Sequence, residues 1–405
     1  MNVRDLVETG QLLSNAAERK LRLGVAGLGR AFTVMLPTFT GDPRIALVAA
    51  ADSRAEARQR FSADFSAKAY QTVEELCAEP AVEAVYVATP HQHHARHALL
   101  AAQHGKHLLV EKPIALSLDE CTAIIEAASR ARVQLVVGHS HSFDLPIQRL
   151  RTLVESGAFG TVRMINAINY TDYLYRPRRL EELDTAQGGG AVFNQAAHQV
   201  DIVRLIGGGR ATSVRAMTGA WDAARPTEGA YAALLTFAEG AFASITYNGY
   251  GNFDSDEFQG WIGEMGQKKE PYVRSSRPRF ANTLEEAAFK IARSYGGPEY
   301  RPSVAQTPMH NHFGTLLVSC ERADLRALPS GVMIYQHGVA RLESLAPPTV
   351  PRAEVIDELY RAVVHGKAPL HNGAWAMATL EVVLAILRSA GEGRDVALTR
   401  QVGLS

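Results

Sequence analysis

The sequence has few cysteines, no excess of either charge and no long hydrophobic run, and each absence excludes a class of protein. Only three cysteines, Cys77, Cys121 and Cys320, are spread over 405 residues without a CxxC pair, which excludes a disulfide framework and a cysteine zinc knot. Lysine plus arginine and aspartate plus glutamate both total 42, a balance that argues against nucleic-acid binding. The longest apolar runs, such as Ala81–Pro90, have the length of a strand, and the first twenty residues lack the apolar core of a signal peptide. We therefore expect a soluble, cytoplasmic protein without membrane contact.

The N-terminal third alternates short apolar runs with amphipathic stretches. Such continuous Val, Ile and Leu runs are typical of parallel strands that helices cover on both faces. The expected strands are Leu21–Gly27, Ile45–Ala51, Ala84–Thr89, His107–Val110 and Val133–Gly138, and the expected helices include Val73–Ala78, His94–Gln103 and Leu118–Ala131. The pattern predicts an α/β Rossmann domain, a doubly wound parallel sheet over residues 1–142, with a helical extension over 1–20.

In the remaining chain the pattern of apolar and polar residues is different. Segments of alternating polarity predict antiparallel strands at Val162–Tyr170, Tyr231–Phe237 and Ala241–Tyr247. We therefore expect a second domain, α+β with a large and mainly antiparallel sheet, over 143–372. Residues 373–405 are expected to form a helix, centred on Ala374–Ser389, and a tail that packs back near the domain junction. The polar stretch Glu264–Arg301 has eight Lys/Arg against five Asp/Glu and is interpreted as a solvated surface excursion.

A glycine-rich turn follows the first expected strand. The segment G-V-A-G-L-G places Gly27 and Gly29 before a helix that starts near Arg30, where backbone N–H groups can hold a pyrophosphate. The usual third glycine is replaced by Phe32. Asp52 ends the next strand 23 residues after Gly29, which is the spacing of a ribose-binding acid. The motif predicts NAD as the cofactor, and a nearby arginine leaves NADP open.

Two further segments resemble a known family. Val85–Ser117 contains T-P-x-x-x-H and E-K-P, and Gly188–Gly208 contains a glycine run followed by a helix with His and Asp. In this order the two segments are similar to the glucose–fructose oxidoreductase, inositol dehydrogenase and MocA (Gfo/Idh/MocA) family, over nearly the whole chain. The resemblance implies an NAD(P)-dependent dehydrogenase that acts on CH–OH or CH–CH donors.

The resemblance also implies catalytic residues. Lys112 should lie beside the nicotinamide and the reacting hydroxyl, followed by Pro113 in a cis bond, and its ammonium suits a developing alkoxide. His198 should be the base, since an imidazole titrates near neutrality. Many members have Asp four residues before this His, and this chain has Asn194 instead. Whether Lys112 or His198 accepts the proton therefore stays open, and Asp201 is interpreted as an orienting residue.

The cofactor site is expected to draw on every loop at the end of a parallel strand. The expected contacts are Gly27, Gly29, Arg30, Ala31, Asp52, Ser53, Arg54, Thr89, Pro90, His91, His94, Glu111 and Lys112. The tract His91–His107 holds six of the fourteen histidines, and His93 and His97 have a workable zinc spacing. No Cys, Asp or Glu lies close by in the sequence, so we expect no metal, although a zinc-dependent hydrolase is an alternative.

Three polar and aromatic clusters are candidates for the substrate wall. Arginine forks suit carboxylates and tyrosine faces suit a flat ring. The expected substrate residues are His139, His141, Tyr173, Arg176, Arg178 and Arg179, and Met309–Gly314 is a third cluster. These features look like the branch of phthalate 4,5-cis-dihydrodiol dehydrogenases, which serve aromatic compound degradation. Aromatisation of such a product lessens the demand for a strong catalytic dyad, which makes Asn194 tolerable.

Two alternatives stay open. The first is a dehydrogenase of a sugar or an inositol-type cyclitol, and the second is a non-catalytic NAD-binding regulator on the same fold. The presence of both Lys112 and His198 argues against the regulator, which would not need a proton-transfer pair. The expected partner is a small-molecule substrate, and the resemblance implies a homodimer or homotetramer built on the open face of the second sheet.

Overall fold

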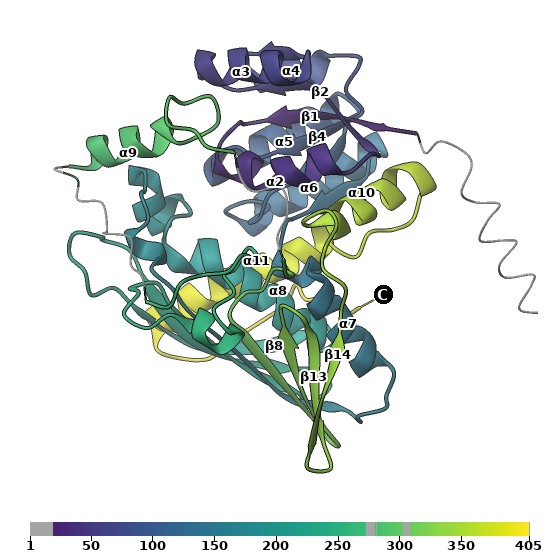
Figure 1. Cartoon of the computed structure of the whole chain (residues 1–405), viewed down its shortest axis with the longest axis vertical. Coiled ribbons are helices and arrows are strands. Elements are labelled where there is room, and N and C mark those ends of the chain that lie inside the picture. The colour runs from purple at the N-terminus through teal and green to yellow at the C-terminus, as the bar shows by residue number, and fades with distance from the viewer. Residues whose placement is uncertain (1–18, 273–279, 281, 303–307, 405) are drawn as a thin grey trace, which may run out of the picture.

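The computed structural model describes residues 19–272, 280, 282–302 and 308–404 (Figure 1). The expected helical extension falls almost wholly on residues 1–18, outside the described residues. The described chain forms two sheets, with helices packed on both faces of the first and on one face of the second.

The first sheet is built from parallel strands in the order β3-β2-β1-β4-β5-β6. Its strands are β1 (Leu21–Ala26), β2 (Ile45–Ala51), β3 (Lys68–Tyr70), β4 (Ala84–Val87), β5 (His107–Val110) and β6 (Leu135–Val137). Its helices are α2 (Arg30–Gly41), α3 (Ala55–Phe65), α4 (Val73–Ala78), α5 (His94–Gln103) and α6 (Leu118–Ala131). This is the dinucleotide-binding order, whose topological switch point lies between β1 and β4. The predicted doubly wound sheet is confirmed.

Local sequence explains where these elements begin and end. Helices α4 and α6 each start with a capping box, formed by Thr72 with Glu75 and by Ser117 with Glu120. Strand β4 is buried along its whole length, as expected for a central parallel strand. Because every strand runs in the same direction, the loops after β1, β2, β4, β5 and β6 meet at one edge of the sheet.

The second sheet has nine strands in the order β14-β13-β12-β11-β7-β10-β9-β8-β15 and is antiparallel except for the pair β7/β10. Its strands are β7 (Val162–Tyr170), β8 (Ala211–Gly219), β9 (Ala230–Phe237), β10 (Phe242–Asn248), β11 (Thr315–Cys320), β12 (Asp324–Leu328), β13 (Gly331–Gln336), β14 (Val339–Ser344) and β15 (Val396–Ala397). Alternating burial, as in β9 and β10, gives one face to the core and one to solvent. The expected mainly antiparallel sheet is confirmed.

Helices α7 (Leu145–Glu155), α8 (Ala197–Ile206) and α11 (Gly373–Glu392) cover the inner face of the second sheet (Figure 1). Helix α11 has the length and composition of a membrane span, but two-thirds of its apolar window is buried. It packs against α6, α8 and β8, so it joins the two halves of the molecule as a core helix.

Two segments differ from expectation. Helix α10 (Ala353–His365) lies within the range 143–372 that we assigned to the second domain, yet its apolar side packs on the first sheet through Val355, Ile356 and Leu359. The stretch Glu264–Arg301 is more than a solvated excursion. Its helix α9 (Thr283–Ala292) forms buried ion pairs, and the following Tyr295 is fully buried against Phe32. Each segment was misjudged because its apolar residues contact a partner far away in the sequence.

Candidate active site

The turn after β1 has the shape of a phosphate cradle. Gly27 has φ +95°, and a Cβ atom there would lie 2.8 Å from the Ala88 carbonyl oxygen, so only glycine fits. At Gly29, the N-cap of α2, no atom lies within 4 Å of the position that a Cβ would take. The first turn of α2, with Arg30 and Ala31, receives no side-chain cap and contains no acid. A free helix N-terminus beside open space fits the pyrophosphate of NAD.

Asp52 follows β2 at the same edge and is already engaged by the protein. Its Oδ2 accepts a hydrogen bond of 2.8 Å from the Leu28 N–H, and its Oδ1 accepts bonds of 2.9 and 3.1 Å from the backbone N–H and Nε of Arg54. Ser53 between them is exposed. Asp52 thus holds the glycine turn in place in addition to its expected role at the ribose. The guanidinium of Arg54 compensates the charge that would repel a 2′-phosphate.

The loop after β4 carries the expected nicotinamide-side residues, but they divide into two roles. Thr89 and Pro90 are half-buried at the sheet edge, and the Nδ1 atom of His91 lies 3.1 Å from the Gly188 carbonyl oxygen. His94 is fully buried, with both ring nitrogens 2.8 Å from carbonyl oxygens, those of Pro113 and Thr89. The expectation that His94 contacts the cofactor is corrected, because this ring joins two loops from inside.

Lys112 reaches across to the second half of the molecule. Its Nζ donates a hydrogen bond of 2.7 Å to the Asn194 carbonyl oxygen, and the Lys112–Pro113 peptide is cis as expected. Burial lowers the pKa of Lys112 to about 8, while Glu111 and Glu264 act in the opposite direction. Glu111 accepts a hydrogen bond from the Tyr86 hydroxyl, and burial raises its pKa. A lysine with this pKa can release and accept a proton near neutral pH.

Asn194 and His198 do not form the pair that the spacing suggested. Asn194 lies in a π-helical turn, η6 (Val192–Ala196), that precedes α8, and its Nδ2 donates to the carbonyl oxygens of Gly190 and Gly188. His198 is buried, and its Nδ1 has no hydrogen-bond partner in the described part of the chain. Burial and the positive charges of Lys112 and His141 lower the pKa of His198 well below its usual value, so the ring is neutral.

A second histidine faces His198. The rings of His141 and His198 lie 4.8 Å apart in an edge-to-face arrangement, and both contact Phe313. His141 is paired on both sides: its Nδ1 lies 2.6 Å from Asp144 Oδ2, and its Nε2 lies 3.5 Å from Glu264 Oε1. Burial alone would lower the pKa of His141, but Asp144 and Glu264 raise it to about 9. The site therefore holds a charged imidazole against a neutral one.

Glu264 is the acid of this cluster. Burial would raise its pKa, but His141, Arg176 and His312 outweigh burial and lower it to about 2. One-third of its side chain is exposed, so this carboxylate is also in contact with solvent. His139, expected to line the substrate site, is instead buried beside His141, and its Nε2 bonds Asp144 at 3.1 Å.

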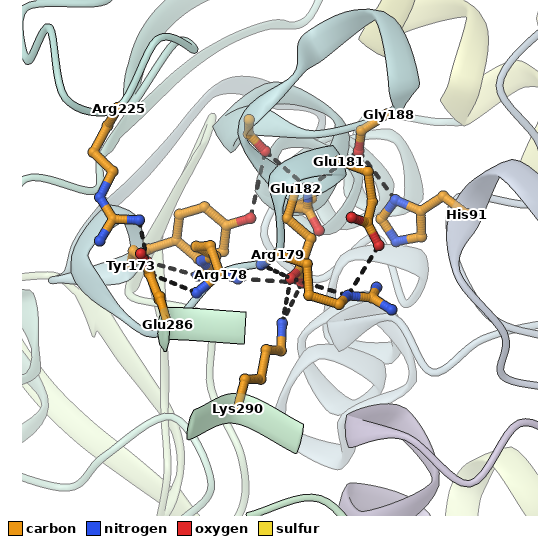
Figure 2. A network of polar contacts seen from close by, with 12 residues as sticks. His91, Tyr173, Arg178, Arg179, Glu181, Glu182, Gly188, Arg225, Glu286 and Lys290 are labelled. Atoms are coloured by element: carbon orange, nitrogen blue, oxygen red, sulfur yellow. Dashed lines mark hydrogen bonds and ion pairs between the residues drawn. The ribbon is translucent and has the colours of Figure 1, made fainter. Parts of the chain in front are cut away.

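The expected arginine clamp is only partly present. The guanidinium of Arg178 lies 3.8 Å above the ring of Tyr173 and donates to the Tyr173 carbonyl oxygen, and Arg179 pairs with Glu181 and Glu182 (Figure 2). Tyr173 and two of the three expected arginines, Arg178 and Arg179, thus belong to a structural network, which corrects their assignment to the substrate wall.

Arg176 differs from the other two expected arginines. About half of its side chain is exposed, and it pairs with Asp172 at 2.9 Å. Burial lowers its pKa, but Glu264 and Asp172 together raise it above the usual value. The pKa of Arg30 is in turn lowered by burial and by the charge of Arg176.

Sequence reasoning missed the charged partners of His141. Asp144 follows at i+3 on the same turn and could have been found from that spacing. Glu264 comes from a segment more than a hundred residues away, for which the sequence contains no indication. Phe313 stood in the polar and aromatic cluster Met309–Gly314, whose role was left undefined.

The described residues contain no group of three or more His, Cys, Asp or Glu that could hold a metal ion. His93 and His97 do lie ring to ring, at 5.7 Å between centroids, but the Nδ1 atom of His97 is bonded to Thr89 Oγ1. Asp201, a residue of α8, accepts hydrogen bonds from Trp375, Ser142 and Thr379, so its carboxylate connects α8 to α11 and to the loop after β6.

Comparisons with known proteins identify the family. The family model of the NAD-binding Rossmann fold of the GFO/IDH/MocA oxidoreductases matches residues 21–139, and the C-terminal domain model matches residues 147–259. The chain is 48% identical, over 91% of its length and 94% of the relative's, to 1-carboxy-3-chloro-3,4-dihydroxycyclohexa-1,5-diene dehydrogenase of Comamonas testosteroni.

Solved structures show the same architecture. A Bordetella bronchiseptica protein named as a dehydrogenase aligns with a TM-score of 0.87 and 42% identity, over 93% of this chain and 100% of that one. The WlbA dehydrogenase of Bordetella pertussis, solved with NADH and UDP-GlcNAcA, has a TM-score of 0.66 at 21% identity, over 94% and 99%, and shares the fold. On these matches and the nucleotide cradle, the chain belongs to the Gfo/Idh/MocA family of NAD-binding oxidoreductases and is a dehydrogenase.

Proposed function

We propose that this enzyme oxidises a carboxylated cyclohexadiene cis-diol, such as the 4,5-dihydrodiol of phthalate, to the corresponding catechol. The name of the Comamonas relative describes a substrate of this class, with a carboxylate and two neighbouring hydroxyls on a six-membered diene. The observation that carries the proposal is that Lys112 lies close enough to His198 for its charge to lower the pKa of that ring, at the edge where the parallel strands end and with the half-exposed Arg176 nearby.

NAD is proposed to bind along the loops after β1, β2 and β4 and supplies the hydride acceptor. Gly27 and Gly29 leave room for the pyrophosphate, and Asp52 receives the ribose hydroxyls. Because Arg54 already neutralises Asp52, we propose that NAD is preferred without strict exclusion of NADP.

Lys112 is the proposed acceptor of the hydroxyl proton. Its pKa of about 8 leaves a share of the amine neutral under ordinary conditions, and the Asn194 carbonyl oxygen fixes the direction of Nζ. An ammonium held there also stabilises the negative charge that develops on the substrate oxygen. Because Lys112 takes the hydroxyl proton in this scheme, His198 stays neutral and can accept a proton from another atom of the substrate.

The carboxylate end of the substrate is proposed to face Arg176. This guanidinium stands on the cleft wall with Arg30 close enough for their charges to interact. Two positive groups suit a ring that carries one or two carboxylates, because ionic hydrogen bonds of this kind are strong and directional. The neutral hydroxyls of a sugar would gain less from the same pair.

The test is NADH formation by the purified protein with NAD. It would be offered the cis-dihydrodiols of phthalate and of benzoate, the dihydrodiol of benzene as a matched ring without a carboxylate, and a panel of sugars and inositols. We expect turnover with the carboxylated dihydrodiols and at least about tenfold lower kcat/KM for the uncharged ring, the loss of about one ionic hydrogen bond. Turnover confined to polyols would reject the substrate proposal and keep the enzyme class.

We also propose a cytoplasmic homo-oligomer. The three cysteines are free, and two of them are buried, as expected in a reducing compartment. Met217, Leu234 and Phe242 are exposed on strands β8, β9 and β10 of the helix-free face of the second sheet. An apolar sheet face of this kind commonly binds a second copy of the chain.

A further inference from the structure

The site contains more proton-transfer groups than an alcohol oxidation needs. One acceptor for the hydroxyl proton is sufficient, and Lys112 fills that role in the proposed function. Beside it stand two more imidazoles, His141 and His198, in ring contact at 4.8 Å and both buried. Their surroundings differ: His141 is paired with Asp144 and Glu264, whereas the Nδ1 of His198 has no partner among the described residues.

Conversion of the proposed substrate to a catechol requires a second proton transfer. Oxidation of one carbinol gives a hydroxycyclohexadienone, whose neighbouring carbon still carries a hydrogen and a hydroxyl group. This compound becomes a catechol only when that carbon loses its proton and the new carbonyl oxygen gains one. The step is an enolisation, and it calls for a base and an acid that act on adjacent atoms.

We propose that the enzyme catalyses this aromatisation as a second activity of the same site, with His198 as the base and His141 as the acid. The inference rests on the proposed function, because it requires a diol whose product can aromatise. His198 takes the proton from the carbinol carbon, and the electrons of the broken C–H bond form the ring double bond. The carbonyl π electrons move to oxygen, which takes the proton from His141 Nε2.

The protons of this step balance. His198 ends with one proton more and His141 with one fewer, and proton exchange with solvent after the catechol leaves restores both rings. No oxidant is consumed in this step, so the overall reaction remains diol plus NAD to catechol, NADH and one proton. That proton leaves through Lys112.

The geometry of the pair supports these roles. The contact of His141 with Asp144 is short, at 2.6 Å, and its contact with Glu264 is long, at 3.5 Å. Nδ1 is therefore held, while the proton on Nε2 can pass to a closer acceptor on the Glu264 side. Phe313 packs against both rings and keeps water from them. In this environment a neutral imidazole and an imidazolium can coexist, because each has a partner set suited to its charge.

The test follows two products in one stopped-flow experiment, with wild-type enzyme, NAD and the cis-4,5-dihydrodiol of phthalate. NADH is read by its near-ultraviolet absorbance and the catechol by its own spectrum. In the wild-type enzyme we expect both to appear together. In His141→Gln and in His198→Gln we expect NADH to form while the catechol lags, its formation slowed by about 100-fold.

Two controls keep the outcomes separate. His104→Gln changes an exposed histidine at the end of α5 and should behave as the wild type. Glu264→Gln removes the carboxylate beside His141 Nε2 at a side chain that is one-third exposed, and it should reproduce the lag even if His141→Gln folds poorly. Simultaneous NADH and catechol in all these variants would overturn the aromatisation proposal and leave the oxidation intact. No NADH from the wild type with any carboxylated dihydrodiol would instead overturn the proposed function.

Discussion

His141 and His198 touch each other and yet are stabilised in different protonation states. The difference comes from their neighbours. His141 lies between two carboxylates, which favour the cation, whereas His198 faces Lys112 and His141 and has no acid beside it. At the scale of single residues, this chain has Asn194 where many family members have Asp. The carboxylate that pairs with an imidazole in this site comes instead from Asp144, which contacts His141 in a different loop.

Lys112→Ala should remove most of the turnover and leave the cofactor site intact. We expect kcat to fall by about 100-fold or more, because the positioned proton acceptor is lost. Turnover would be followed by NADH formation, and the Kd of NAD would be measured by quenching of tryptophan fluorescence. Lys367→Ala, an exposed lysine after α10, is the control. Near-normal turnover of Lys112→Ala would show that another group accepts the proton.

Asp52→Ala should raise the Kd of NAD more than that of NADP. The carboxylate is expected to bind the ribose hydroxyls of NAD, and its removal also frees Arg54 to meet a 2′-phosphate. The two dissociation constants would be measured by calorimetry. If both rise equally, the carboxylate acts only through its bond to the Leu28 N–H, and the ribose assignment is wrong.

Asp144→Asn should destabilise the fold in a pH-dependent manner. The pKa of His141 is raised to about 9, so its contribution to stability is complete below about pH 6.5 and is lost as the pH rises through about 9. Leaving this buried cation with only the more distant Glu264 should lower the free energy of unfolding by about 3–5 kcal/mol at pH 7. Urea denaturation at pH 7 and pH 10 should show that the free energies of unfolding of the wild type and the variant differ less at pH 10. If the difference between them does not change with pH, the His141–Asp144 pair is not ionic.

At the scale of elements, the loop between β7 and α8 is held from both sides. Its short helices η4 (Leu180–Leu183) and η5 (Thr185–Gln187) lead to Gly188, whose carbonyl oxygen meets His91 and Asn194. On the outer side, Lys290 of α9 pairs with Glu182 (Figure 2). The α9 helix thus braces the loop that shapes the cofactor-facing side of the site.

Lys290→Met should loosen this brace. The variant keeps the length of the side chain but leaves Glu182 with one fewer cation, so η4 and α9 should separate more often. We expect faster limited proteolysis within α9 and a higher KM for substrate, with kcat changed less than KM. Lys290→Arg restores the charge and should restore both values. If Lys290→Met resists the protease as well as the wild type does, the Lys290–Glu182 pair is only a surface contact and does not hold the loop.

At the scale of the whole molecule, the two sheets play different parts. The first sheet brings five loops to one edge, and the second provides a platform whose inner face is covered by α7, α8 and α11 (Figure 1). Helix α11 contacts both α6 and α8, so the two sides of the site are held in register by one long element. Among the described residues, no helix covers the outer face of the second sheet.

Leu234→Glu should reveal whether that outer face binds another copy. Leu234 is 47% exposed in the middle of β9, and a carboxylate there would oppose burial of the face. We expect sedimentation to show a dimer or tetramer for the wild type and a smaller species for the variant. Leu180→Glu, at an exposed leucine away from this face, serves as the control. An unchanged oligomer in Leu234→Glu would place the interface elsewhere.

Much of the first half of the molecule could be predicted because its information is local. The run Ile45–Ala51 is a strand in the structure with the same bounds as predicted, and Leu118–Ala131 is a helix between the predicted bounds. Uninterrupted apolar runs, glycine at the turn and capping residues act over a few neighbours, so the amino-acid sequence determined these elements and the family by itself.

Tertiary structure alone decided the charges of the site. Glu264 meets His141 across more than a hundred residues, and Arg178 packs on Tyr173 instead of the substrate wall. Asn194, in the π-helical turn, bonds the carbonyl oxygens of Gly188 and Gly190. The physical reason is that a pKa and an ion pair depend on distances between groups that only the folded chain brings together. Periodicity and motif spacing contain no such distances, and the family resemblance that indicated Lys112 and His198 did not indicate that Glu264 pairs with His141.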